Sequence, residues 1–143
     1  MKKKLVYIFI ILFFINTIGL SDFQDNGDGT VADRETGLVW EQGTGGAMTW
    51  ENALIYCESL SLGGKDDWRL PSRNELQSII DYTTNNPSVD IIFFPDTELS
   101  FYWSSTTDVS QSARAWYIDF ENGDVSFNDK TNSYYVRAVR SGQ

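Results

Sequence analysis

The chain has 143 residues, with 20 acidic and 11 basic side chains, no histidine and a single cysteine. This length suits one domain with its own core. The lack of histidine excludes Ser-His-Asp and Cys-His catalytic triads and zinc sites built on imidazole. One cysteine cannot form a disulfide within the chain. The net charge of -9 argues against a nucleic acid or an anionic lipid as a partner.

The N-terminus has the pattern of a secretory signal peptide. Three lysines, Lys2–Lys4, precede the apolar run Leu5–Ile15, and small or polar residues follow it. The sequence therefore predicts a signal peptide over 1–21 and a domain over 22–143, with an uncleaved membrane anchor as the alternative. Loss of the lysines leaves a net charge of about −12. The predicted location is secreted, periplasmic or at the cell surface.

The first part of the domain predicts a β-hairpin and then a helix. A polar, glycine-rich turn begins at Asp22, and strands are expected over Thr30–Asp33 and Leu38–Glu41. Apolar residues then recur with helical spacing from Trp50, and Thr49 is the expected N-cap. The second half of the domain has a different pattern.

A second helix is expected after Ser72, because Ser72 and Glu75 have the spacing of a capping box. Beyond it the apolar period changes to two, and Asn122-Gly123 is a strong hairpin signal. Strands are expected over Phe101–Ser105, around 116–120, around 125–127, and as one last strand over Tyr134–Arg140. A hairpin, two helices and antiparallel strands together predict an α+β domain.

Several short blocks resemble one family when they are taken in order. They are Asn26–Val31, Thr36–Trp40, Thr49-Trp50 with Tyr56-Cys57, Asp67–Pro71, Tyr102–Ser105 and Val136–Arg140. Together they resemble the Lcl C-terminal domain family, named for a bacterial collagen-like adhesin. The resemblance implies a C-type-lectin-like fold, with two helices packed against twisted antiparallel sheets, in a surface or secreted setting. It also implies a role in adhesion, since the domain of the founding adhesin is associated with host glycans.

A more distant similarity links the Arg-Leu-Pro junction Arg69–Pro71 to formylglycine-generating enzymes. Their chemistry needs reactive cysteines. Cys57 lies on the apolar stripe of the first expected helix, which indicates a buried, unreactive thiol. We therefore do not expect that activity in this chain.

A calcium site is one interpretation of the polar turn. Several of its residues match the EF-hand template, and Asp28 adds another oxygen ligand. The predicted metal ligands are Asp22, Asn26, Asp28 and Asp33. Calcium is the one cofactor that the sequence suggests. The alternative is a glycine turn in which these side chains bind nearby backbone amides.

Three arginines allow two interpretations. Arg69, Arg137 and Arg140 either clamp an anion or form ion pairs with acids such as Asp67 and Glu75. Arg137 and Arg140 are three residues apart in one expected strand, so they face opposite sides. This spacing favours structural ion pairs.

The predicted ligand contacts are Tyr102, Tyr117, Asn128, Asp129 and Tyr135. Tyrosine rings stack on sugars, and Asn and Asp bind hydroxyl groups. Asn128-Asp129 also resembles part of the Trp-Asn-Asp triplet that supplies calcium ligands in sugar-binding C-type lectins, the alternative being a turn. Core packing is the alternative for the tyrosines.

We expect an exported, non-catalytic binding module that recognises a surface glycan or a protein through the loops 83–99 and 106–114. The alternative is a structural or assembly subunit of the cell envelope, for which a homo-oligomer is plausible. A glycoside-acting enzyme comes third, with Asp66-Asp67 or Asp119 and Glu121 as its carboxylates.

Overall fold

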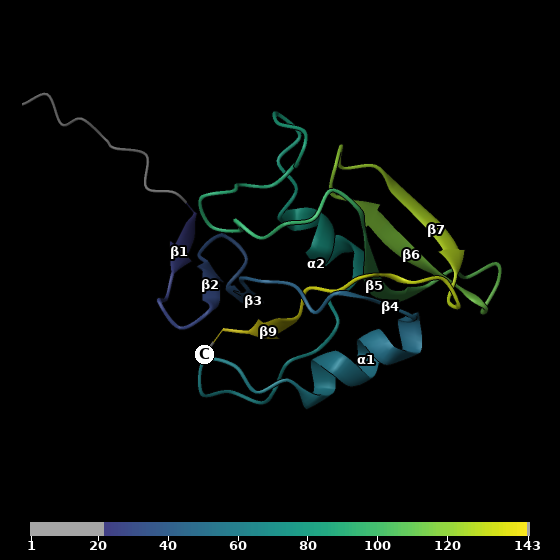
Figure 1. The fold of residues 1–143 in the computed structure, drawn as a ribbon, viewed down its shortest axis with the longest axis horizontal. Coiled ribbons are helices and arrows are strands. Elements are labelled where there is room, and N and C mark those ends of the chain that lie inside the picture. Colours follow the sequence, from purple (N-terminus) through teal and green to yellow (C-terminus); the bar gives the residue numbers. More distant parts are fainter. Residues whose placement is uncertain (1–21, 143) are drawn as a thin grey trace, which may run out of the picture.

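The computed structural model describes residues 22–142, so the predicted signal peptide over 1–21 lies outside the described residues. Within this range the fold has two helices and nine strands, which confirms the predicted α+β class (Figure 1). The C-type-lectin-like likeness stays a prediction. The elements are β1 (Phe23–Asp25), β2 (Thr30–Asp33), β3 (Leu38–Glu41), β4 (Ala47–Met48), α1 (Trp50–Ser59), α2 (Arg73–Ser78), β5 (Phe101–Thr107), β6 (Arg114–Asp119), β7 (Val125–Asp129), β8 (Tyr134–Tyr135) and β9 (Val139–Ser141).

The strands form two sheets. One sheet has four antiparallel strands in the order β1-β2-β3-β9, and the other has five strands in the order β4-β8-β5-β6-β7. Within the five-stranded sheet, β5 and β8 run parallel and the other neighbours run antiparallel. Figure 1 shows the two sheets side by side, with β1, β2, β3 and β9 on the left and β5, β6 and β7 on the right.

The two helices cover opposite faces of the five-stranded sheet. Trp103 of β5 is fully buried in a cluster with Cys57 of α1. Its neighbour Tyr102 is fully buried in a second cluster, with Leu76 of α2. Because successive side chains on a strand point to opposite faces, the two helices must lie on different sides of β5. The domain therefore has two hydrophobic clusters that share one sheet.

The predicted capping box at the start of α2 is confirmed. The Ser72 hydroxyl accepts a hydrogen bond from the backbone N–H of Glu75 at 3.2 Å, and the Glu75 carboxylate accepts one from the backbone N–H of Ser72 at 2.9 Å. Each group satisfies a donor that the helix itself leaves free. Thr49 occupies the N-cap of α1 as predicted, but its side chain makes no capping hydrogen bond.

Two predictions of strand extent are wrong. The polar segment after Asp22 contains a strand, β1, whose backbone pairs with β2. The single last strand over Tyr134–Arg140 is two strands, β8 and β9, in different sheets. Between them the Val136 and Ala138 carbonyls accept hydrogen bonds from the backbone N–H groups of Gly45 and Glu41. The chain therefore crosses from one sheet to the other at this point.

Arg137 lies in that crossing and is fully buried. Its guanidinium donates hydrogen bonds to the carbonyls of Gln42 and Gly43 and to the Thr97 hydroxyl, at 3.3, 3.0 and 3.0 Å. It also lies over the rings of Phe94, Tyr102 and Phe120. Burial lowers the pKa of Arg137 to about 10, so it remains charged at neutral pH. It has no ion-pair partner in the described part of the chain, and the predicted pairing is therefore wrong for Arg137.

The other two arginines form the predicted ion pairs. Arg69 binds both carboxylate oxygens of Glu75, at 2.6 and 2.7 Å. Arg140 binds both oxygens of Asp67, at 2.7 and 3.2 Å. The guanidinium groups of Arg69 and Arg140 are each paired with a carboxylate of this domain. The three arginines therefore do not form one anion clamp.

Candidate functional site

Three aromatic side chains form a half-buried surface on the five-stranded sheet. They are Phe101 of β5, Tyr117 of β6 and Tyr134 of β8, which we call the aromatic platform. The ring centroids lie 4.7 Å apart for Phe101 and Tyr117, 5.0 Å for Tyr117 and Tyr134, and 5.1 Å for Phe101 and Tyr134. The platform therefore combines three rings in mutual contact into one partly exposed apolar surface.

Strand register explains how these rings meet. Tyr117 lies opposite Trp103 in the β5–β6 pair, and Phe101 points to the same face because it is two residues away from Trp103. Strand β8 is the neighbour of β5 on its other side. This pairing brings the ring centroid of Tyr134 to 4.4 Å from that of Trp103. Trp103 is fully buried with side chains of α1, whereas the three platform rings keep part of their surface exposed.

Hydrogen-bonding groups share the face of the platform. Ser126 and Asn128 of β7 lie on this face, and Asp119 lies opposite Phe101. The Asn128 amide donates a hydrogen bond to the Tyr134 hydroxyl at 2.7 Å, which leaves the hydroxyl hydrogen free to bond elsewhere. Burial raises the pKa of Tyr134, so the hydroxyl stays protonated at neutral pH. Such a surface can stack on a ring and bind hydroxyl groups beside it.

Of the predicted ligand contacts, Tyr117 and Asn128 come together at the platform. Tyr102 is fully buried, and its ring stacks on Phe120 at 4.0 Å, so the predicted surface contact is wrong for Tyr102. The ring centroid of Tyr135 lies 5.6 Å from that of Tyr102, on the opposite face of the sheet from the platform. Asp129 is exposed and also belongs to that opposite face, where it lies beside Arg114.

Two platform residues are absent from the predicted set. Phe101 has a signal in the sequence, because its spacing of two from Trp103 places both rings on one face of a strand. Tyr134 has no comparable local signal, since it reaches the platform only because β8 pairs with β5 across a long sequence separation.

The predicted calcium ligands lie at opposite ends of the β1–β2 hairpin. Asp22 and Asp33 line one cavity, and Asn26 and Asp28 line another. The prediction of one calcium site formed by all four residues is therefore wrong, because the paired strands β1 and β2 keep the two ends of the hairpin apart. Asp28 instead accepts hydrogen bonds from the N–H and hydroxyl of Thr30, as expected for a turn. Across residues 22–142, no three acidic or cysteine side chains lie close enough to hold a metal ion.

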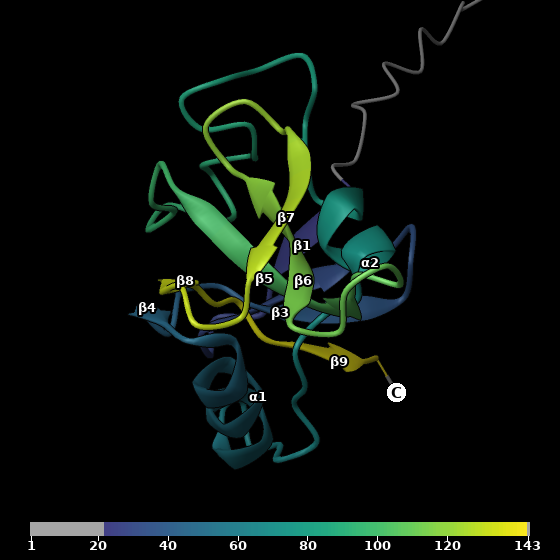
Figure 2. The same cartoon turned by 90° about the vertical axis from the view of Figure 1, so that its right-hand side faces the viewer.

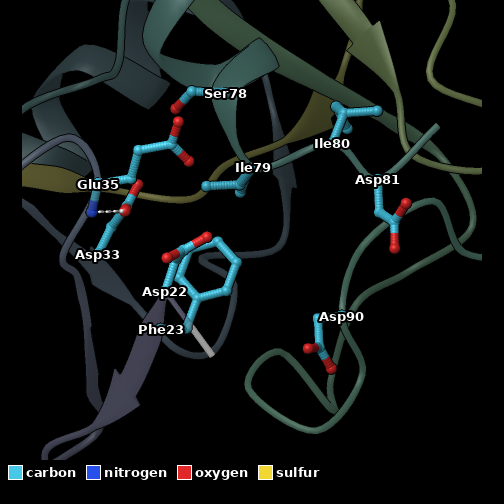
Figure 3. Close-up of a pocket in the computed structure, with 9 residues that line it drawn as sticks. All are labelled: Asp22, Phe23, Asp33, Glu35, Ser78, Ile79, Ile80, Asp81 and Asp90. Atoms are coloured by element: carbon cyan, nitrogen blue, oxygen red, sulfur yellow. Dashed lines mark hydrogen bonds between the residues drawn. The ribbon is translucent and has the colours of Figure 1, made fainter. Parts of the chain in front are cut away.

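The cavity beside Asp22 and Asp33 has a volume of about 350 Å³. It forms where the end of the β1–β2 hairpin meets the C-terminal end of α2, and we call it the acidic pocket (Figure 3). Its carboxylates come from Asp22, Asp33, Glu35, Asp81 and Asp90, and its other lining residues are Phe23, Ser78, Ile79 and Ile80. None of these carboxylates forms an ion pair with a residue that the structure describes.

The structure also decides several other sequence predictions. Asn128 and Asp129 are the last two residues of strand β7, so the predicted turn is wrong for them, and the likeness to the lectin-type triplet stays a prediction. Asp67, of the predicted carboxylate pair Asp66-Asp67, binds Arg140, which holds its pKa below its usual range. Burial raises the pKa of the Cys57 thiol to about 12, so it stays protonated and unreactive at neutral pH.

A profile of the Lcl C-terminal domain matches residues 29–140. The chain belongs to the Lcl C-terminal domain family. The match runs from the turn before β2 into β9, so it includes both helices and the whole aromatic platform. Family membership associates the chain with the adhesins from which the family takes its name. No curated protein gives a significant match. Within residues 22–142, none of the helices is long and apolar enough to cross a membrane.

Proposed function

We propose that this Lcl C-terminal domain is a non-catalytic adhesion module that binds a glycan at the aromatic platform. The observation that supports this proposal is the contact of Phe101, Tyr117 and Tyr134 with one another on an open part of a sheet face. Aromatic rings offer a large apolar area to the C–H face of a sugar, and polar groups at the rim set its orientation. Asn128 and Ser126 supply such groups.

The charge of this region favours a neutral glycan. Asp119 lies opposite Phe101 on the same face, and the domain without its first three lysines has a net charge of about −12. A sulfated or carboxylated sugar would meet repulsion from both. The loop 106–114 joins β5 to β6 at the far end of these strands and extends the surface that a longer glycan would contact.

The proposed setting is outside the cytoplasm, at the cell surface or in the periplasm. The signal-peptide pattern over 1–21 and membership in an adhesin-associated family support this setting. A surface protein of the same or another cell is the other class of ligand that such a module would bind.

A glycan array tests the proposal with purified protein from expression of the complete chain. The array identifies a ligand, and calorimetry then measures its affinity for the unaltered protein and for Phe101→Ala and Tyr117→Ala. Loss of one stacking ring is expected to weaken binding about tenfold, which corresponds to about 1.4 kcal/mol. Phe127→Ala is the matched control, because Phe127 is a partly exposed ring on the opposite face of the same sheet.

The control must bind as tightly as the unaltered protein. If Phe101→Ala and Tyr117→Ala bind the glycan with unchanged affinity, the platform is not the binding site. If the protein binds none of the neutral and acidic glycans on the array, the result contradicts the proposal and favours a structural or assembly role for the domain.

A further inference from the structure

Helix α2 separates two surfaces of opposite charge. A group of cationic and aromatic side chains lies at its first residue, and the acidic pocket lies at its last residue. Figure 2 shows α2 at the edge of the fold, beside β6. The helix has six residues, so its two ends are only about 8 Å apart. The two charged groups are therefore about one short helix apart, and we call the surface that runs from one to the other the bipolar face.

The cationic end consists of Arg73, Trp116, Phe127 and Arg114, which we call the cationic strip. The Arg73 guanidinium lies 4.6 Å from the centre of the Trp116 ring, and that ring meets Phe127 edge-on at 5.1 Å. The Arg114 guanidinium lies 5.0 Å from the Phe127 ring. Neither arginine has an ion-pair partner among the residues described. Stacking thus holds the Arg73 guanidinium in place and leaves it available to a partner, whereas Arg114 donates a hydrogen bond to Gln111 and has Asp129 opposite it on β7.

The acidic end has the opposite character. Glu35 is exposed, and Figure 3 shows its side chain directed toward Ser78, the last residue of α2. Asp81 and Asp90 lie on the other side of the pocket. Hydrogen bonds from Thr83 hold the pKa of Asp81 below its usual range, so this carboxyl stays ionised. The Arg73 guanidinium therefore lies one short helix away from a group of carboxylates that form no ion pair with the residues described.

We propose that two copies of this chain associate through the bipolar face. A two-fold axis across the middle of α2 sets the two helices antiparallel and brings the cationic strip of each copy against the acidic pocket of the other. Both contacts are then attractive and identical, as an isologous interface requires. One arrangement of two identical copies therefore gives two attractive contacts, each between the cationic strip of one copy and the acidic pocket of the other.

Exposed aromatic side chains give this interface apolar contacts as well. Tyr82 follows α2 and is 62% exposed, and its hydroxyl accepts a hydrogen bond from Gln77 of the helix at 2.8 Å. Phe127 is 38% exposed at the edge strand β7. Tyrosine, phenylalanine and arginine are enriched in protein interfaces. The aromatic platform lies on the other face of the sheet, so the dimer leaves it open and presents two platforms together.

Light scattering of the purified protein, expressed as the complete chain, tests this proposal. The unaltered protein is expected to show a concentration-dependent equilibrium between monomer and dimer. Arg73→Glu and Glu35→Lys should each raise the dimer dissociation constant about tenfold or more, because each places two like charges opposite one another at the contact between positions 73 and 35. Neither change is expected to disturb α2, because an acid at position 73 lies at the start of the helix and a base at position 35 lies near its last residue, Ser78, where each charge is favourable.

A charge exchange separates a specific contact from a folding defect. An equimolar mixture of Arg73→Glu and Glu35→Lys should regain the dimer, with one copy of each variant in native mass spectrometry, because the side chains at positions 73 and 35 then have opposite charges in both contacts. The double variant should also dimerise with itself. Lys65→Glu and Glu58→Lys make the same charge changes away from this face and should leave the dimer unchanged.

Three results overturn the proposal. The first is a strict monomer at about 100 µM, above the dissociation constants expected for a specific interface. The second is a dimer that both reversals leave intact. The third is a mixture that fails to restore association. Glycan affinity per platform is expected to be equal in the monomeric variants and the unaltered protein, so the failure of this proposal is distinguishable from a failure of the proposed glycan site.

Discussion

Removal of the Arg137 side chain should destabilise the domain strongly. The guanidinium donates three hydrogen bonds, to Gln42, Gly43 and Thr97, and each is worth about 1.5 kcal/mol at the low end for a charged donor. The cost of burying the charge offsets part of this sum, and truncation to alanine adds the cost of a cavity. We expect Arg137→Ala to lower the free energy of unfolding by about 4 kcal/mol. Arg137→Met keeps most of the volume and should lose about half as much.

Urea unfolding followed by tryptophan fluorescence measures both variants. For a domain of this size, about 4 kcal/mol corresponds to a fall in Tm of about 16 °C, which calorimetry can check. A loss below about 1 kcal/mol in Arg137→Ala would refute the reasoning, because the carbonyl groups would then find other partners at little cost. A methionine variant less stable than the alanine variant would show that the cavity does not contribute.

Two more predictions concern titratable groups. Hydrogen bonding to Arg69 lowers the pKa of Glu75 below its value of 4.5 in the unfolded chain, so this group stabilises the fold above that value and the contribution is lost as the pH falls below it. Urea midpoints between about pH 6 and pH 3 should therefore fall less steeply for Glu75→Gln than for the unaltered protein, and equal slopes would contradict this assignment. Cys57 should not react with a thiol reagent at about pH 8 until the protein unfolds. Rapid labelling of the native protein would show that the thiol is accessible.

The two faces of the five-stranded sheet divide the proposed roles of the domain. The face toward α1 carries Phe101, Tyr117 and Tyr134, and the face toward α2 carries Trp116 and Phe127. Because side chains alternate along each strand, neighbouring residues of β6 contribute to different surfaces. A single twisted sheet can therefore bind a ligand on one side while its other side contacts a second copy.

Local patterns in the sequence were sufficient for several elements. The capping box of Ser72 and Glu75 marked the start of α2, because its two hydrogen bonds join residues only three apart. The strands Thr30–Asp33 and Leu38–Glu41 were predicted with the bounds that the structure has. The family blocks also pointed to the correct family. The polar segment after Asp22 was harder, since β1 has few apolar residues and depends on pairing with β2.

The sequence by itself determined the helix starts, the β2–β3 and β6–β7 hairpins and the α+β class, because each depends on hydrogen bonds or side-chain alternation among residues close in the chain. Only the tertiary structure decided which distant strands became neighbours. That choice brought Tyr134 to the platform, split the last strand at Arg137 and left this arginine without an ion pair to any acid within residues 22–142. It also held the predicted calcium ligands apart, since the strands of one hairpin separate Asp28 from Asp33. These contacts follow from packing between remote segments, which no local pattern specifies.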